Sequence, residues 1–225
     1  MVDNPRRIKS YVLRAARMSE AQKLAYDKLS PRWCVSHDQV FDWEHHFPQA
    51  SRRVVEIGFG MGDATRRLAV HQKDWGILGV EVHRPGVGKL LWWMDEEKIE
   101  NIRIVEHDAV EVLQKAIAPE SVDGVHIWFP DPWPKKRHHK RRLIQVEFIS
   151  LVMQILRPGG YIHAATDWQP YADHILETLQ SVSGLSNKYP DWAPKPEYRP
   201  DTKFEARGVA ADRVIRDIVF EKEAL

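Results

Sequence analysis

The chain of 225 residues has a single cysteine, Cys34, and no apolar run long enough to cross a membrane. One cysteine excludes an intrachain disulfide and a zinc site built from several cysteines, and such usage is typical of a reducing compartment. A membrane span needs about 18 consecutive apolar residues, so we expect a cytoplasmic protein with no membrane contact. The net charge is only +1, so any affinity for nucleic acid must come from local clusters of basic residues.

One such cluster lies in residues 135–142, where six Lys/Arg and two His follow one another without a break. Just before it, Pro130, Pro132 and Pro134 punctuate the end of an apolar run. Proline fixes φ and removes a backbone donor, so we expect a stiff turn that holds Asp131. A dense cationic run attracts phosphate backbones. A solvated helix start is the equally simple interpretation of these residues alone.

Apolar strands alternate with amphipathic helices from residue 53 onward. The expected strands are residues 54–57, 76–82, 102–105, 122–129, 161–165 and 214–220. The expected helices are residues 63–69, 87–98, 110–117 and 140–157, followed by one that begins near Pro170. This alternation predicts an α/β fold with a single doubly wound, Rossmann-like and mostly parallel sheet, covered by helices on both faces.

Residues 1–30 contain little that could form a core and contribute to a second, milder basic cluster. We therefore expect a mobile, basic N-terminal arm over residues 1–30 and one folded domain over residues 31–225. His37, His45 and His46 follow the arm, but adjacent histidines point to different sides of a helix or strand. With no third ligand at a suitable spacing, we expect no metal site.

The turn after the first strand contains Gly58, Gly60 and Gly62, which is typical of a site for a nucleotide-containing cofactor. A dinucleotide fingerprint would need glycine at position 63, where this chain has Asp63. Glu56 and Asp63 flank the turn and would repel a pyrophosphate. The same carboxylates suit S-adenosylmethionine, which carries ammonium and sulfonium charges. We therefore expect S-adenosylmethionine rather than NAD or FAD.

Two further acids close or follow successive strands. Glu81 lies 23 residues past Gly58, at the end of the second strand, where nucleotide-type folds hold a ribose hydroxyl pair. Asp108 follows the third strand and is placed to accept from the adenine amine. Either acid alone is more often a solvated strand-end residue. The series of Glu56, Glu81 and Asp108 on successive strands favours a cofactor site.

Several segments together resemble the bacterial tRNA (guanine-N7-)-methyltransferases, a family of class I S-adenosylmethionine-dependent enzymes. These are residues 54–69, 81–86, 130–138 and 202–205, together with residues 11–14 and Arg17 in the arm. The glycine turn is shared by many methyltransferases, whereas the Pro-Asp-Pro-Trp-Pro-Lys turn and the Thr-Lys-Phe-Glu segment are more specific. Residues 31–225 would then be a methyltransferase domain of the class I type.

The resemblance implies a role for each motif residue. Glu56, Glu81, Asp108 and Asp131 would contact S-adenosylmethionine, with Asp131 as the catalytic residue. The residues that would hold the substrate are Lys135, Asp167, Thr202, Lys203, Phe204 and Glu205. Those that would contact RNA are Arg137, His138, His139, Lys140, Arg141 and Arg142. The implied reaction is methylation of a guanine in the variable loop of tRNA, and we expect a monomer.

Several alternatives stay open at this point. A non-catalytic RNA-binding protein with a vestigial cofactor site would keep the basic run, but the intact glycine turn and its acids argue against it. A methyltransferase for small molecules or proteins has no use for residues 135–142, whereas one acting on another RNA does. Asp131 could stabilise charge on the purine or accept from guanine N–H groups. Trp128, Phe129 and Trp133 could stack a base or pack in the core.

Overall fold

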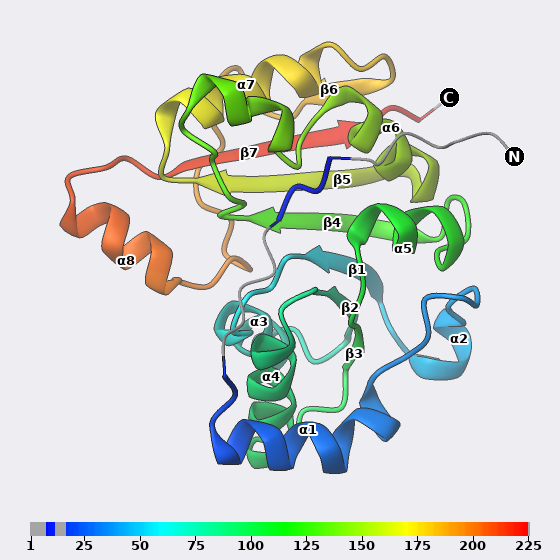
Figure 1. Ribbon diagram of the computed structural model, residues 1–225. Helices are drawn as coiled ribbons and strands as arrows, with labels where there is room; N and C mark the ends of the chain where they lie inside the picture. The colour runs from blue at the N-terminus through cyan, green and yellow to red at the C-terminus, as the bar shows by residue number, and fades with distance from the viewer. Residues whose placement is uncertain (1–7, 12–16, 225) are drawn as a thin grey trace, which may run out of the picture.

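The computed structural model describes residues 8–11 and 17–224, and its centre is one twisted sheet of seven strands (Figure 1). The strands are β1 (Arg52–Ile57), β2 (Trp75–Val80), β3 (Ile102–Val105), β4 (Val122–Trp128), β5 (Leu156–Thr166), β6 (Leu185–Asn187) and β7 (Arg216–Lys222). Their order across the sheet is β3-β2-β1-β4-β5-β7-β6. Strands β1 to β5 pair in parallel, and β7 pairs antiparallel with both β5 and β6. The expected doubly wound, mostly parallel sheet is confirmed.

Helices cover both faces of the sheet. They are α1 (Glu20–Trp33), α2 (Trp43–His46), α3 (Asp63–His71), α4 (Arg84–Glu96), α5 (Ala109–Lys115), α6 (Val146–Ile155), α7 (Gln169–Gln180) and α8 (Lys203–Ala210). The helices α5, α6 and α7 share one apolar core with the sheet, while α1, α3 and α4 share a second core on the other face. None of the helices in the described part of the chain combines the length and apolar character that crossing a membrane requires.

The helix expected over residues 140–157 is shorter than predicted. Residues Lys136–Arg141 form a 3-10 helix, η1, and α6 begins only at Val146. Between them Arg142 has an extended backbone, and its side chain is buried against the carbonyl oxygen of Pro132 and the ring of Tyr171. This inward turn of the chain separates the basic residues from α6.

The expected boundary at residue 30 falls inside α1. This helix begins with a capping box between Ser19 and Gln22, and it buries Ala25 and Trp33. It lies across α4, where Gly88 allows a close approach of the two backbones. Its apolar residues are few, so the sequence shows no apolar stripe. Residues 1–7 and 12–16 of the expected arm lie outside the described residues.

We predict that Gly88→Ala weakens the packing of α1 on α4. A Cβ atom at this position would lie 2.8 Å from the backbone oxygen of Gln22. Overpacking against backbone costs about 1–3 kcal/mol, more than the gain of about 1 kcal/mol in helix propensity. Denaturant unfolding should therefore show a lower free energy of unfolding. Glu96→Ala, on the exposed end of α4, is the control, and equal stability of the two variants would contradict the prediction.

Candidate functional site

The acids expected to hold ligands gather at one edge of the sheet. Glu56 lies near the end of β1, and Glu81, Asp108, Asp131 and Asp167 follow β2, β3, β4 and β5 in turn. Because these strands run in the same direction, their carboxyl ends meet at the edge beside which α8 lies in Figure 1. Ligands of doubly wound folds bind at this edge, where the strand order reverses between β1 and β4.

Glu56 is a carboxylate buried without full hydrogen bonding. Its side chain is 3% exposed, and its Oε2 atom has no hydrogen-bond partner among the described residues. Burial raises the pKa of Glu56 to about 8, the nearby hydroxyl of Thr65 opposes this rise, and the charge of Glu81 adds to it. A buried acceptor of this kind suits a cationic group of a ligand.

The glycine turn leaves open space beside Glu56. Gly58 and Gly60 have φ values of +76° and +59°, and a Cβ atom on either would meet no described atom within 4 Å. Glu81 braces this turn, since its carboxylate accepts from the backbone N–H groups of Gly60 at 2.7 Å, Val82 at 2.7 Å and His83 at 2.9 Å. Burial raises the pKa of Glu81, and these three donors oppose the rise.

Asp108 and Gly62 play local structural roles in addition to any ligand contact. Asp108 is buried and caps α5, accepting from the N–H of Val110 at 2.9 Å. Gly62 stands at the N-cap of α3 with φ of +75°, and a Cβ atom there would lie 2.8 Å from Cβ of Leu90 on α4. The turn therefore requires glycine at this position on two grounds.

The proline-rich turn after β4 has an unusual backbone. Phe129 and Trp133, on either side of Asp131, have φ values of +53° and +43°, which non-glycine residues rarely adopt and which concentrate at functional sites. Asp131 is exposed between them. The buried Arg142 holds the turn from behind, because its Nε donates to the carbonyl oxygen of Pro132 at 3.0 Å.

The residues of the basic run, 135–142, differ in exposure. Lys135, Lys136, Arg137 and Lys140 are exposed, and His138, His139 and Arg141 are half-buried. Arg141 lies over the ring of Trp133 at 4.2 Å and donates to the carbonyl oxygen of Tyr11. Arg142 is 4% exposed, so the predicted RNA contact of its guanidinium needs correction: this cation holds the turn.

The Thr-Lys-Phe-Glu segment forms the start of α8. Thr202 is its N-cap and accepts from the N–H of Glu205 at 3.0 Å. Lys203 and Phe204 are exposed, and Phe204 lies parallel to Phe129 with 6.0 Å between the ring centroids. Glu205 is held by Arg199 and Lys195. The structure thus brings this segment to the turn that holds Asp131.

Asp167 lies under the far end of α8. A Cβ atom on Gly208 would be 2.9 Å from the Cβ of Asp167, so the helix and the end of β5 are in close contact. The carboxylate of Asp167 pairs with Arg213 at 2.9 Å. Asp167 is therefore near α8, with one of its oxygens already engaged.

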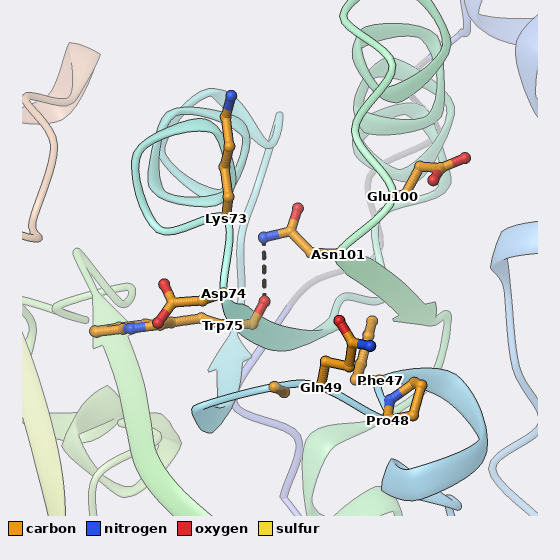
Figure 2. A pocket seen from close by; sticks show the side chains of 9 residues that line it. Phe47, Pro48, Gln49, Lys73, Asp74, Trp75, Glu100 and Asn101 are labelled. Carbon is orange, nitrogen blue, oxygen red and sulfur yellow. Dashed lines mark hydrogen bonds between the residues drawn. The ribbon is translucent and has the colours of Figure 1, made fainter.

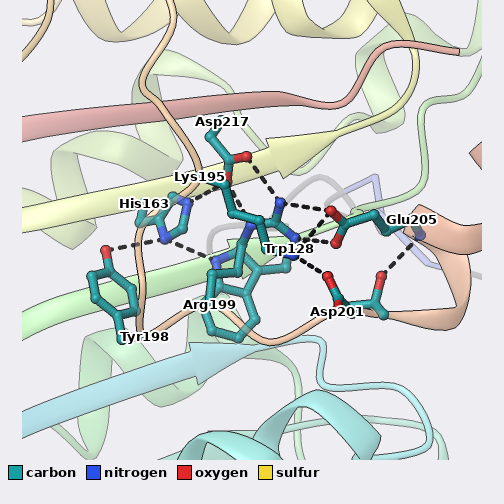
Figure 3. Close-up of polar contacts among 9 residues, drawn as sticks. Trp128, His163, Lys195, Tyr198, Arg199, Asp201, Glu205 and Asp217 are labelled. Atoms are coloured by element: carbon teal, nitrogen blue, oxygen red, sulfur yellow. Dashed lines mark hydrogen bonds and ion pairs between the residues drawn. The ribbon is translucent and has the colours of Figure 1, made fainter. Parts of the chain in front are cut away.

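Sequence reasoning missed a buried polar network that lies between β4 and α8 (Figure 3). It contains His163 on β5, Asp217 on β7 and Arg199 in the loop before α8, and all three are buried. The one available signal in the sequence was Asp217, an aspartate beside the apolar residues Ile218, Val219 and Phe220.

For Trp128, the alternatives were stacking on a base or packing in the core. Its ring is buried and its Nε1 donates to Nδ1 of His163 at 3.1 Å, so it packs in the core.

Three side chains beyond the end of β3 come close enough to raise the question of a metal. Ligand atoms of His37, His107 and Glu111 all lie within 4.8 Å of one another. The two imidazole rings are stacked, with centroids 3.5 Å apart and 13° between their planes. Lone pairs of ring nitrogens lie in the ring planes, so in this arrangement they do not converge on one ion. The absence of a metal remains a prediction.

A pocket of about 490 Å³ lies at the opposite end of the strands (Figure 2). It is bordered by Phe47 before β1, by Asp74 and Trp75 at the start of β2 and by Asn101 before β3. The amide of Asn101 donates to the carbonyl oxygen of Trp75 at 3.1 Å and so fixes this end of the sheet. The pocket therefore lies away from the strand-end acids, and it is not the candidate site.

Comparison with known proteins shows relatives over nearly the whole chain. Residues 50–218 match the family described as "Putative methyltransferase". The tRNA (guanine-N(7)-)-methyltransferase of Paraburkholderia xenovorans (strain LB400) is 54% identical over 218 residues, which cover 96% of this chain and 84% of that protein. The protein of the same name from Burkholderia thailandensis is 52% identical over 219 residues, covering 97% and 83%.

Solved structures share the fold at low identity. The 16S rRNA methyltransferase KamB matches with a TM-score of 0.58 and 13% identity, covering 83% of this chain and 95% of that chain. An rRNA methylase from Streptococcus thermophilus matches with a TM-score of 0.51 and 16% identity, covering 93% and 100%. These likenesses show a class I methyltransferase fold. With relatives more than half identical along its length, the chain belongs to the tRNA (guanine-N(7)-)-methyltransferase family.

Proposed function

We propose that this protein transfers a methyl group from S-adenosylmethionine to N7 of a guanine in the variable loop of tRNA. The observation that carries the proposal is membership of the family, which rests on 54% identity to a relative. The acids at the ends of the strands, which lie at one edge of the sheet, agree with it. The protein would act in the cytoplasm as a monomer.

The residues at this edge fit the cofactor. The unpartnered oxygen of Glu56 would face a cationic group, and the open side of Gly58 and Gly60 leaves room for the ligand. Glu81 would accept from the ribose hydroxyls and Asp108 from the adenine amine. When bound, S-adenosylmethionine supplies an electrophilic methyl group on a cationic sulfur.

The protein's contribution to the chemistry would be positioning and electrostatics. N7 of guanine already carries a free lone pair, so no side chain has to remove a proton from the nucleophile. The exposed carboxylate of Asp131 stands on a turn that Arg142 braces from behind. It would either stabilise the positive charge that develops on the purine or accept from guanine N–H groups and orient the ring.

The exposed part of the basic run would bind the RNA backbone. N7 lies on the major-groove edge, which A-form RNA keeps deep and narrow. The target should therefore be a loop base or one exposed by distortion, as a variable-loop guanine would be. Lys135, Lys136, Arg137 and Lys140 lie next to the Asp131 turn and are exposed, so they are placed to neutralise nearby phosphates.

The test is transfer of a tritiated methyl group from S-adenosylmethionine to purified tRNA, with ribosomal RNA, protein and metabolite pools as separate acceptors. Label recovered from tRNA as 7-methylguanosine supports the proposal. Label in another RNA would favour the alternative substrate, and tRNA binding without transfer would favour a non-catalytic RNA-binding protein.

For the cofactor, we predict that binding of S-adenosylmethionine at pH 7 releases close to one proton. Glu56 has a pKa of about 8 in the ligand-free protein, so it is mostly protonated at pH 7, and a cationic ligand favours its ionised form. Calorimetry in buffers of different ionisation enthalpy measures this proton. Glu56→Gln should bind without the release, and an equal release in parent and variant would contradict the assignment.

The raised pKa of Glu56 also determines how the free energy of unfolding changes with pH. The pKa of Glu56 is higher in the folded protein than the ordinary value of 4.5, so the folded state binds more protons between pH 4.5 and about 8. This contribution to the free energy of unfolding therefore falls as the pH rises through that window. Glu56→Gln should remove this pH dependence in the ligand-free protein, as measured by denaturant unfolding.

For the chemistry, we predict that Asp131→Asn lowers the single-turnover methylation rate by about 10²–10³, comparable to loss of one preorganised electrostatic group. Both ligands should still bind, and higher pH should not rescue the variant, because N7 has no proton to lose. Rapid-quench kinetics with a tRNA transcript measure the rate. Asp95→Asn, at the far end of α4, is the control. A rate for Asp131→Asn within about threefold of the parent would mean that Asp131 only shapes the turn.

For RNA binding, we predict that Lys136→Ala combined with Arg137→Ala weakens tRNA binding. The slope of log K against log[salt] should flatten by about 0.7–0.9 per lost phosphate contact. Lys73→Ala with Lys98→Ala removes the same charge at the opposite end of the strands and is the matched control. Equal slopes for the two double variants would place the RNA elsewhere on the surface.

A further inference from the structure

A continuous path of polar side chains joins the end of β4 to the start of α8 beneath the candidate site (Figure 3). It runs through five residues on five different segments. In order, they are Trp128, His163, Asp217, Arg199 and Glu205. The first of them precedes the Asp131 turn, and the last lies in the Thr-Lys-Phe-Glu segment, so the path connects two walls of the site.

Arg199 is the central cation of this path. Its guanidinium is fully buried. On one side Nη2 donates to Oδ2 of Asp217 at 2.9 Å, and Nε lies 2.6 Å from Oδ1 as an ionic contact without hydrogen-bond geometry. On the other side Nη1 donates to Oε2 of Glu205 at 2.7 Å. A buried charge held by two carboxylates ties their backbones together, because either carboxylate alone would leave it less compensated.

Asp217 continues the path into the sheet. Nδ1 of His163 accepts from Trp128, so Nε2 is the ring nitrogen that carries the proton. This Nε2–H donates to Oδ1 of Asp217 at 2.8 Å. Burial alone would raise the pKa of Asp217, but the hydrogen bond from His163 and the charge of Arg199 hold it below its usual range. The carboxylate thus stays ionised, holds Arg199 directly and orients the ring of Trp128 through His163.

The helix α8 depends on such a tether. It has eight residues, of which Gly208 is the one buried, and an isolated helix of this length is not stable in water. Lys195 adds a second, partly exposed contact to Glu205 at 3.1 Å. The guanidinium of Arg199 is also 5.9 Å from the ring centroid of Phe129, in the Asp131 turn.

We propose that Arg199 is a positioning residue for methyl transfer, which sets α8, with Lys203 and Phe204, against the turn that holds Asp131. The inference rests on the proposed function. In it Glu205 acts through Arg199 by holding α8 in place, and not by holding the substrate directly as the family resemblance implies. Arg199 and Glu205 therefore form one functional unit.

The experiment compares Arg199→Lys, Glu205→Gln and the double variant. Lysine keeps the charge but cannot bridge two carboxylates with a planar fork. Each single variant should lower the single-turnover rate at saturating tRNA by about 10- to 100-fold, with S-adenosylmethionine affinity within about twofold of the parent. The double variant should be no slower than the slower single variant. Arg157→Lys, at an exposed arginine that pairs with the buried Asp123, is the control.

A second readout needs no activity. Hydrogen exchange should accelerate at the amides of α8 in each variant while the amides of β7 stay protected. If Arg199→Lys fails to fold, Lys195→Met takes its place. This variant removes the outer contact to Glu205 and should accelerate hydrogen exchange in α8 to a smaller extent. Unchanged exchange in α8 of Glu205→Gln overturns the inference.

Independent losses in the two single variants, adding in the double variant, also overturn it, because Glu205 would then have its own contact with the substrate. A parent protein that fails to methylate tRNA would instead reject the proposed function, and the exchange data would still decide whether Arg199 holds α8.

Discussion

The common direction of five neighbouring strands is the constraint on which the site depends. Parallel pairing of β1 to β5 places their carboxyl ends at one edge, so acids that are far apart in the chain become neighbours. Each acid needs only to stand at the end of its own strand. The loops that follow can then differ widely, as the glycine turn and the proline-rich turn do, without moving the acids out of reach of a common ligand.

Burial of charge is the second organising feature. Glu56 has a raised pKa because burial disfavours its charged form and the hydroxyl of Thr65 only partly offsets this, whereas the buried Asp217 has a lowered pKa because His163 and Arg199 hold its charged form. The two carboxylates are similarly buried, and their environments push them in opposite directions. Glu56 keeps one oxygen without a hydrogen-bond partner among the described residues, and Asp217 is satisfied within the protein. A buried acid without partners is therefore the better guide to a ligand site.

The basic run shows how one chemical pattern can serve two purposes. Two of its cations, Arg141 and Arg142, pack on Trp133 and on the Pro132 carbonyl. Those that face outward, such as Lys136 and Arg137, keep their charge accessible. The stiff conformation of the turn, with positive φ at Phe129 and Trp133, thus has its own cationic support. The exposed part of the run is therefore smaller than the run in the sequence.

The sequence by itself determined the strands other than β6, their order of appearance and the acids at their ends, because these follow from local apolar patterns and from turn residues such as Gly62. The short strand β6 (Leu185–Asn187) was not expected. It also carried the motifs of the family. Tertiary structure alone decided that α1 packs on α4 through Gly88, that Arg142 turns inward, and that Arg199 joins Asp217 to Glu205. These features depend on which distant segments the sheet brings together, and a local pattern holds no record of such pairings. The sequence does not distinguish a buried arginine from an exposed one, because the difference lies in the neighbours that the fold supplies.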